Sequence, residues 1–171
     1  MLQDHPASSG VVLSVPLIAR IAAEAPAIRS VKLEDPPTPA KVTRIRSALP
    51  DLKVYGGLGG VFFLEELDRG THGTMTGFAY PEALCGVWEA HATGKRELAV
   101  ERFFHALPLI RFEFQEALGL AIRKSLYVIR GVIDDAHVRA PTSELDAASV
   151  DELRWLVDRL RLDPSVAGPL T

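Results

Sequence analysis

Residues 28–39 read Ile28-Arg29-Ser30-Val31-Lys32-Leu33-Glu34-Asp35-Pro36-Pro37-Thr38-Pro39, and they contain a predicted strand, a break and a helix start. The first seven residues alternate in polarity around Val31 and Leu33 as a strand does, and the two consecutive prolines end the strand. Thr38 followed by Pro39 is typical of a helix N-terminus, because a hydroxyl can cap the first turn and proline suits its first position. The predicted helix has its apolar face at Val42, Ile45 and Leu49, and Pro50 ends it.

The same alternation of helix and strand extends to both sides. A helix is predicted at Val15–Ala25, with Ser14 as its N-cap. A second strand is predicted at Leu52–Tyr55, a short helix at Val61–Asp68 and a third strand at His72–Thr76. Strands that alternate with helices form parallel sheets, so the pattern predicts an α/β fold. A parallel sheet of about three strands leaves both edges uncovered, which indicates part of a larger structure.

From Pro81 onward the pattern is helical. The predicted helices are Pro81–His91, Lys95–Phe104 with a continuation to about Phe114, Glu116–Ile129, and a last helix that ends at Leu160 and opens with a capping box at Ser149–Glu152.

Composition excludes several classes of function. The formal net charge of −3 over 171 residues gives no basic field for nucleic acid or anionic membranes. Cys85 is the single cysteine, so no internal disulfide forms. The N-terminus lacks the features of a signal peptide, and no apolar run approaches the ~20 residues of a membrane span. We therefore expect a cytoplasmic protein. The histidines are scattered without metal-ligand spacing, so no metal site is expected.

Lys32 lies in the predicted strand 28–34, where side chains alternate between the two faces. Val31 and Leu33 suit packing against helices, so Lys32 is expected on the opposite face. One interpretation is a strand-end lysine that pairs with Glu34 or Asp35 near solvent. The other is a nucleophile inside a barrel, where burial lowers the pKa of a lysine from about 10.4 towards ~7–8 and so supplies neutral amine.

A series of motifs in order resembles one family. Gln3–Gly10 resembles its Tyr-Asn-x-Pro-x-x-Thr-Gly turn after the fifth barrel strand, and Val31–Asp35 resembles its Ile-Lys-(Glu/Asp) on the sixth. Val54–Gly57 matches the end of the seventh strand, and Gly70–Thr76 is similar to the eighth-strand Gly-x-x-Gly-(Val/Ile)-Ile-Ser. Two later segments resemble the family's helical tail, Ile122–Leu126 and Val138–Pro141. The family is that of dihydrodipicolinate synthase and N-acetylneuraminate lyase, the class I, Schiff-base aldolases.

The resemblance implies a partial (β/α)8 TIM barrel, from the end of strand 5 through strand 8, followed by a C-terminal helical tail. Residues 1–80 would be the barrel part, and residues 81–171 the last barrel helix and the helical extension. Lys32 would form the Schiff base with a pyruvate-like 2-oxo acid, and the reaction with an aldehyde would need no cofactor or metal. Homo-oligomers, dimers or tetramers, are common in the family.

The resemblance also implies that the substrate contacts Met75, Gly73 and Gly57. Met75 would present its backbone to the oxo acid, and the two glycines would allow close approach. The alternatives are ordinary barrel packing for Met75 and ordinary turn geometry for the glycines.

Three departures from the family pattern bear on activity. Gln3 stands where the family has a proton-relaying tyrosine, and glutamine has no titratable proton. The carboxylate-binding Gly-Thr-Thr-Gly-Glu turn is absent, and strands 1 to 4 have no counterpart. We therefore expect a truncated lyase with little activity alone. The alternatives are a non-catalytic barrel fragment that acts only in assembly, and an unrelated α/β protein whose lysine is structural.

Overall fold

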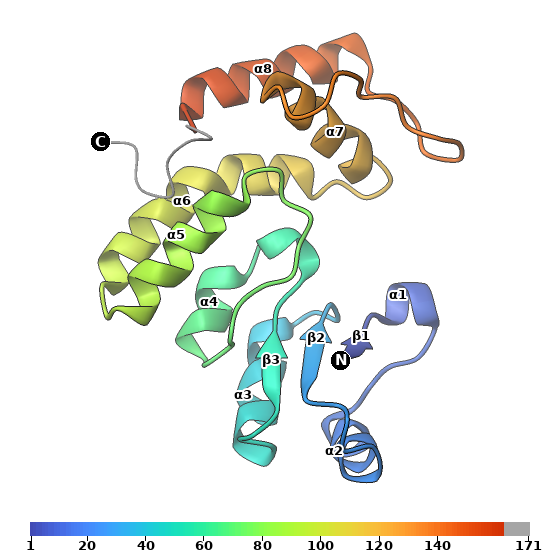
Figure 1. The fold of residues 1–171 in the computed structure, drawn as a ribbon, viewed down its shortest axis with the longest axis vertical. Helices are drawn as coiled ribbons and strands as arrows, with labels where there is room; N and C mark the ends of the chain where they lie inside the picture. Colours follow the sequence, from blue (N-terminus) through green and yellow to red (C-terminus); the bar gives the residue numbers. More distant parts are fainter. Residues whose placement is uncertain (163–171) are drawn as a thin grey trace. The chain divides into compact units, whose positions relative to one another are not determined.

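The computed structural model of the protein describes residues 1–162, which form two compact units, one comprising Met1–Thr76 and the other beginning at Gly77 (Figure 1). The first unit contains a parallel sheet in the order β1-β2-β3. Its strands and connecting helices are β1 (Leu2–Asp4), α2 (Val15–Glu24), β2 (Ser30–Leu33), α3 (Thr38–Ala48) and β3 (Lys53–Tyr55). Its shorter elements are α1 (Pro6–Ser9), the 3-10 helix η1 (Leu58–Gly60) and α4 (Phe63–Asp68).

One face of the sheet is covered by helices and forms the core of this unit. Val31, Leu33 and Val54 are fully buried there, together with Ile18 of α2 and two residues of α3, Val42 and Ile45. The alternation predicted for residues 28–34 is confirmed, because the neighbouring positions Ser30 and Lys32 are only partly buried. We call the other side of the sheet the open face.

The predicted strand at 72–76 is wrong in its extent. The structure has only an isolated parallel bridge there, between Gly56 and Thr74, next to β3. Backbone hydrogen bonds flank it, from Gly56 N to Gly73 O at 3.0 Å and from Met75 N to Gly56 O at 3.0 Å. Gly73 has φ +152°, a value that other residues rarely adopt, so this segment does not continue as a regular strand.

Two predicted helix caps are also wrong. Thr38 does not cap α3, whose N-cap is Pro37, because its hydroxyl donates instead to Glu66 at 2.5 Å. The last helix, α8 (Ala147–Leu160), begins before Ser149, since Asp146 accepts a hydrogen bond from Ser149 N at 2.7 Å. The predicted Ser14 cap of α2 is confirmed by its bond from Leu17 N.

The second unit is helical over its described residues. Its helices are α5 (Pro81–Ala92), α6 (Arg96–Glu113), α7 (Gly119–Ile129) and α8, and α6 packs against each of the other three. The segment before α5 is fixed by the buried Glu113, which accepts from Ala79 N at 2.8 Å and from Arg123 Nε at 2.7 Å. Residues 163–171, at the end of the predicted helical extension, lie outside the described residues, and the predicted division at residue 80 stays a prediction.

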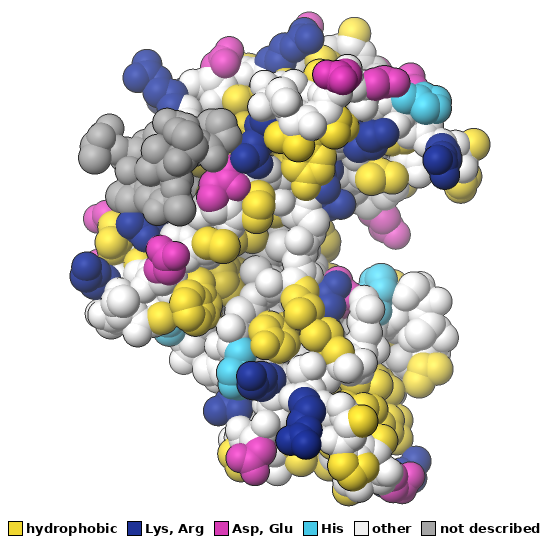
Figure 2. Space-filling model, viewed as in Figure 1, with side chains coloured by type: hydrophobic (Ala, Val, Ile, Leu, Met, Phe, Trp, Pro, Cys, Tyr) yellow, Lys and Arg dark blue, Asp and Glu magenta, His cyan; other side chains and the backbone are white. Residues whose placement is uncertain are grey.

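Hydrophobic side chains interrupt the charged surface of the second unit (Figure 2). Its exposed aromatic residues include Trp88, Phe104, Phe114 and Trp155. Within residues 1–162, no helix has the length and apolar character needed to cross a membrane.

Candidate active site

Lys32 lies on the open face and is largely shielded from solvent. Its Nζ is 3.0 Å from Oε1 of Glu34, and the two side chains are 19% and 14% exposed. They are two positions apart on one strand edge, so they point to the same side. Of the two partners expected from the sequence, Glu34 is therefore the one that pairs with Lys32. Asp35 pairs instead with Lys41 of α3, at 3.2 Å.

Glu34 is the centre of this site's hydrogen bonding. Gln3 Nε2 donates to its Oε2 at 2.5 Å, and its own backbone N–H donates to the carbonyl of Asp4 at 2.9 Å. Burial raises the pKa of Glu34, but hydrogen bonds from Lys32 and Gln3, with the charges of Lys32 and His5, outweigh it and lower the pKa below its usual value. Glu34 is thus a carboxylate at neutral pH. The amide of Gln3, which has no proton to relay, orients that carboxylate.

Gly57 lies against this carboxylate. A Cβ built on Gly57 would be 2.4 Å from Glu34 Cγ and 2.7 Å from its Oε1. Real Cβ atoms do not come that close, so the absence of a side chain at position 57 is what admits Glu34. The close contact with Glu34 explains structurally why position 57 is a glycine. The predicted contact of Gly57 with substrate stays a prediction.

We expect Gly57→Ala to displace the Glu34 side chain and weaken its contact with Lys32. The pKa of Glu34 should then rise towards its usual value, because the hydrogen bonds that lower it are lost. A carbon-13 NMR titration of the glutamate carboxyls measures this. Gly86→Ala on α5 is the matched control, since the nearest atom to its added Cβ would be 3.4 Å away, in Arg102. An unchanged Glu34 pKa in Gly57→Ala would contradict the expectation.

Gly73 and Met75 lie at the end of β3. Met75 is 38% exposed, and its backbone N–H donates to the carbonyl of Gly56, as described above. Gly73 owes its residue type to its positive φ. Both residues are beside the end of the sheet, as the resemblance implies, and their contact with a substrate remains a prediction.

Sequence reasoning missed Tyr55. In the sheet, Gln3, Lys32 and Tyr55 are aligned across the three strands. Tyr55 therefore supplies a phenol hydroxyl on the strand next to Lys32, on the same face. The alternation of Leu52–Tyr55 was the available signal, since it separates buried Val54 from partly buried Tyr55.

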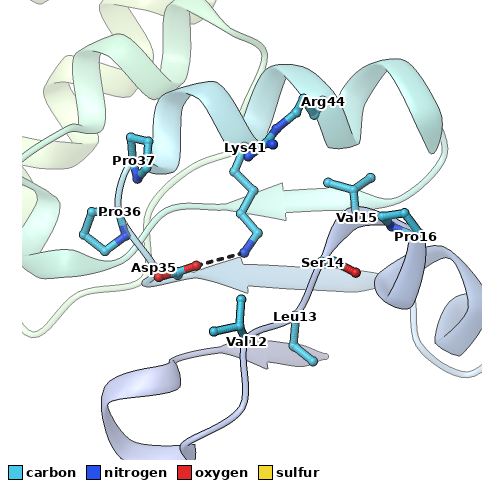
Figure 3. Close-up of a pocket in the computed structure, with 10 residues that line it drawn as sticks. All are labelled: Val12, Leu13, Ser14, Val15, Pro16, Asp35, Pro36, Pro37, Lys41 and Arg44. Carbon is cyan, nitrogen blue, oxygen red and sulfur yellow. Dashed lines mark hydrogen bonds and ion pairs between the residues drawn. The ribbon is translucent and has the colours of Figure 1, made fainter.

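Behind the sheet, on the helix side, two buried polar contacts hold α3. Lys41 Nζ is 2.6 Å from Oδ2 of Asp4, whose side chain is fully buried. Thr38, one turn earlier, binds the buried Glu66 of α4. A cavity of about 380 Å³ adjoins Lys41, which extends from α3 towards Asp35 (Figure 3). None of the predicted site residues lines this cavity.

These features define the class. Parallel strands each followed by a helix that covers one face, with the partly buried Lys32 on the other face, form part of a (β/α)8 barrel. The chain belongs to the dihydrodipicolinate synthase and N-acetylneuraminate lyase family of class I aldolases, as its motifs predicted. No family model matches it.

Known relatives support this assignment. The chain is 33% identical over 168 residues to L-2-keto-3-deoxyarabonate dehydratase of Azospirillum brasilense, covering 97% of this chain and 53% of the relative. It superposes on dihydrodipicolinate synthase from Rhodopseudomonas palustris with a TM-score of 0.88 and 34% identity, covering 92% of this chain and 54% of that one.

A third similarity concerns the fold alone. YagE, a prophage protein of the dihydrodipicolinic acid synthase family from E. coli K12, was solved in complex with pyruvate, and it matches with a TM-score of 0.81 and 22% identity over 95% of this chain and 56% of its own. The chain thus spans about half the length of the proteins it matches, and the predicted partial barrel is confirmed.

Proposed function

We propose that this chain carries the Schiff-base lysine of a lyase, aldolase or dehydratase that acts on a pyruvate-like 2-oxo acid. The observation that carries the proposal is Lys32 itself, sheltered on the open face of the barrel strands and 3.0 Å from a carboxylate. The dehydratase relative, whose substrate is a 2-keto-3-deoxy acid, supports a 2-oxo acid as substrate. The pyruvate complex of YagE is consistent with the same class of ligand.

The chemistry would begin at the lysine amine. Neutral Nζ attacks the ketone carbon of the oxo acid, and the resulting carbinolamine loses water to give an iminium. The iminium withdraws electrons, so a proton leaves C3 and an enamine forms. The enamine then adds to an aldehyde, or it expels a hydroxyl from C4, which departs with a proton as water. Glu34, whose lowered pKa makes it a weak base, would hold and orient the amine, and the ammonium form of Lys32 would lose its proton to solvent before the attack. Tyr55, which lies next to Lys32 in the register of the sheet, would serve in place of the family's tyrosine.

Turnover by these 171 residues alone is proposed to be low. A barrel interior is filled by side chains from all of its strands, and the chain covers about half of its relatives. Assembly as a homo-oligomer, as in family members, is part of the same proposal. The second candidate function, a fragment that acts only in assembly, is separated from the first by the following test.

Incubation with pyruvate and borohydride should reduce the iminium to a stable secondary amine on Lys32, which peptide mass spectrometry locates. Lys32→Arg keeps the positive charge but should give no adduct at this position, since a guanidinium is not a nucleophile of this kind. Lys53→Arg is the matched control, because Lys53 is an exposed lysine on the neighbouring strand. It should leave the adduct at Lys32 unchanged.

Two results would count against the proposal. An adduct spread over several lysines, with Lys32→Arg retaining the total yield, would assign ordinary surface reactivity. The absence of any adduct, at pyruvate concentrations that label an established family member, would favour the fragment that acts only in assembly.

A further inference from the structure

Glu66 is a buried acid that the proposed reaction does not use. It lies on α4 with 1% of its surface exposed, and its Oε1 accepts a hydrogen bond from the Thr38 hydroxyl at 2.5 Å. Thr38 opens α3, the helix that follows the strand of Lys32. One oxygen of Glu66 therefore holds the start of that helix.

The other oxygen of Glu66 is directed at the end of β3. A Cβ built on Gly56 would be 1.8 Å from Oε2, so the carboxyl occupies the place where a side chain at position 56 would be. Gly56 is the residue that pairs with Thr74. The carboxyl thus packs directly on the backbone pair that joins the end of β3 to the predicted eighth strand.

Thr74, the residue paired with Gly56, carries a hydroxyl on this side of the backbone pair. Glu66 Oε2 and Thr74 Oγ1 are both buried, and neither has a hydrogen-bond partner among the described residues. Paired residues of neighbouring parallel strands lie about 4.8 Å apart and point to the same side, so the carboxyl that replaces a Gly56 side chain faces Thr74. Burial raises the pKa of Glu66 to about 7. The charge of Glu65 also raises this pKa, while the hydrogen bond from Thr38 lowers it. The protonated carboxyl has the hydroxyl that such a bond to Thr74 requires.

We propose that Glu66 is a positioning residue for the site around Lys32, since it ties the start of α3, through Thr38, to the Gly56–Thr74 pair. Gly57 follows Gly56 and packs against the side chain of Glu34, which pairs with Lys32. Gly73 and Met75 flank Thr74. A displacement of the Gly56–Thr74 pair therefore reaches both the lysine's partner and the predicted substrate contacts. The inference rests on the proposed Schiff-base function of Lys32.

The test compares how pyruvate concentration controls borohydride trapping on Lys32 in three variants. Glu66→Ala removes the bond from Thr38 and the carboxyl that packs on Gly56. It should raise the half-saturating pyruvate concentration about tenfold, while the trapped fraction at saturation stays close to that of the wild type, because a misplaced backbone weakens substrate positioning first. Glu66→Gln keeps an acceptor for Thr38 and a donor for Thr74, so it should stay within about twofold of the wild type. Glu65→Gln is the matched control, since Glu65 is the exposed neighbour on the same helix.

Thr74→Val removes the acceptor alone while preserving side-chain shape, so it tests the inference even if Glu66→Ala does not fold. It should shift half-saturation in the same direction as Glu66→Ala. A folded Glu66→Ala or Thr74→Val with unchanged half-saturation would overturn the inference.

If the wild type forms no adduct, the proposed function fails and the positioning role is decided by amide NMR. Thr74→Val and Glu66→Ala should then move the resonances of Gly57 and Gly73, and Glu66→Gln should not. Unmoved glycine resonances in both of the disruptive variants would exclude the positioning role.

Discussion

Replacing Lys41 with methionine is expected to lower the free energy of unfolding by about 3–5 kcal/mol, because it leaves the fully buried Asp4 carboxylate without its cation. Lys41 is 5% exposed and lies between two acids, Asp4 at 2.6 Å and Asp35 at 3.2 Å. Methionine preserves most of the side-chain volume, so the loss reports the missing charge rather than a cavity. Urea denaturation at neutral pH measures it.

The double variant Asp4→Asn with Lys41→Met removes the uncompensated charge and should recover a large part of the loss. Arg44→Met is the matched control, since Arg44 is an exposed cation one turn further along α3, and it should change stability by less than about 0.5 kcal/mol. If Lys41→Met were no more destabilising than Arg44→Met, the Asp4 contact would contribute nothing to the fold.

The arrangement of strand and helix was predictable because its signals are local. Val31 and Leu33 alternate with Lys32, two prolines follow, and the next apolar residues recur with helical spacing. Each of these features determines the type or the end of a single helix or strand. The structure confirms the face of the strand on which Lys32 lies. The parallel order of the strands then follows from the alternation of the two element types.

The buried polar contacts were not predictable, because they depend on register between elements. Lys41 neighbours the predicted apolar face of its helix, and nothing local indicates that Asp4, many residues earlier, ends the adjacent strand at the level of Leu33. Thr38 carried the local signal of a helix cap, but its hydroxyl binds Glu66 instead. A tertiary partner outcompeted the local one, since Glu66 is buried and needs a donor.

The contacts of the glycines in the site were also not predictable from the sequence. The resemblance implied that Gly57 allows close approach of the substrate, which stays a prediction, and the structure places the Glu34 side chain against Gly57. Gly56 was noted only within the segment Val54–Gly57 that matches the end of the seventh strand, yet a Cβ there would overlap the Glu66 carboxyl. The residue type reveals that space is needed, and only the folded chain reveals which group takes it.

Glu66 is also expected to make the stability of the protein fall as pH rises from about 4.5 to about 7. Its pKa is raised from 4.5 to about 7 by burial, so the folded state binds a proton that the unfolded state has released in this interval. The stabilisation is complete below pH 4.5 and is lost as pH passes through the folded-state pKa. The shift corresponds to about 3 kcal/mol between the two ends of the interval.

Glu66→Gln cannot titrate, so this part of the pH dependence should disappear from its urea denaturation curves at pH 5, 6, 7 and 8. Burial also raises the pKa of Glu113, which acts in the same direction, while the lowered pKa of Glu34 acts in the opposite direction at acid pH. Both groups remain in the variant, so the difference between wild type and Glu66→Gln isolates Glu66. Glu65→Gln should follow the wild type closely, because burial, the largest cause of the raised pKa of Glu66, is kept and only the smaller contribution of the Glu65 charge is lost. Parallel curves for wild type and Glu66→Gln would show that Glu66 is already ionised in the folded protein at pH 5, and the hydrogen bond inferred between its hydroxyl and Thr74 would then lack its proton.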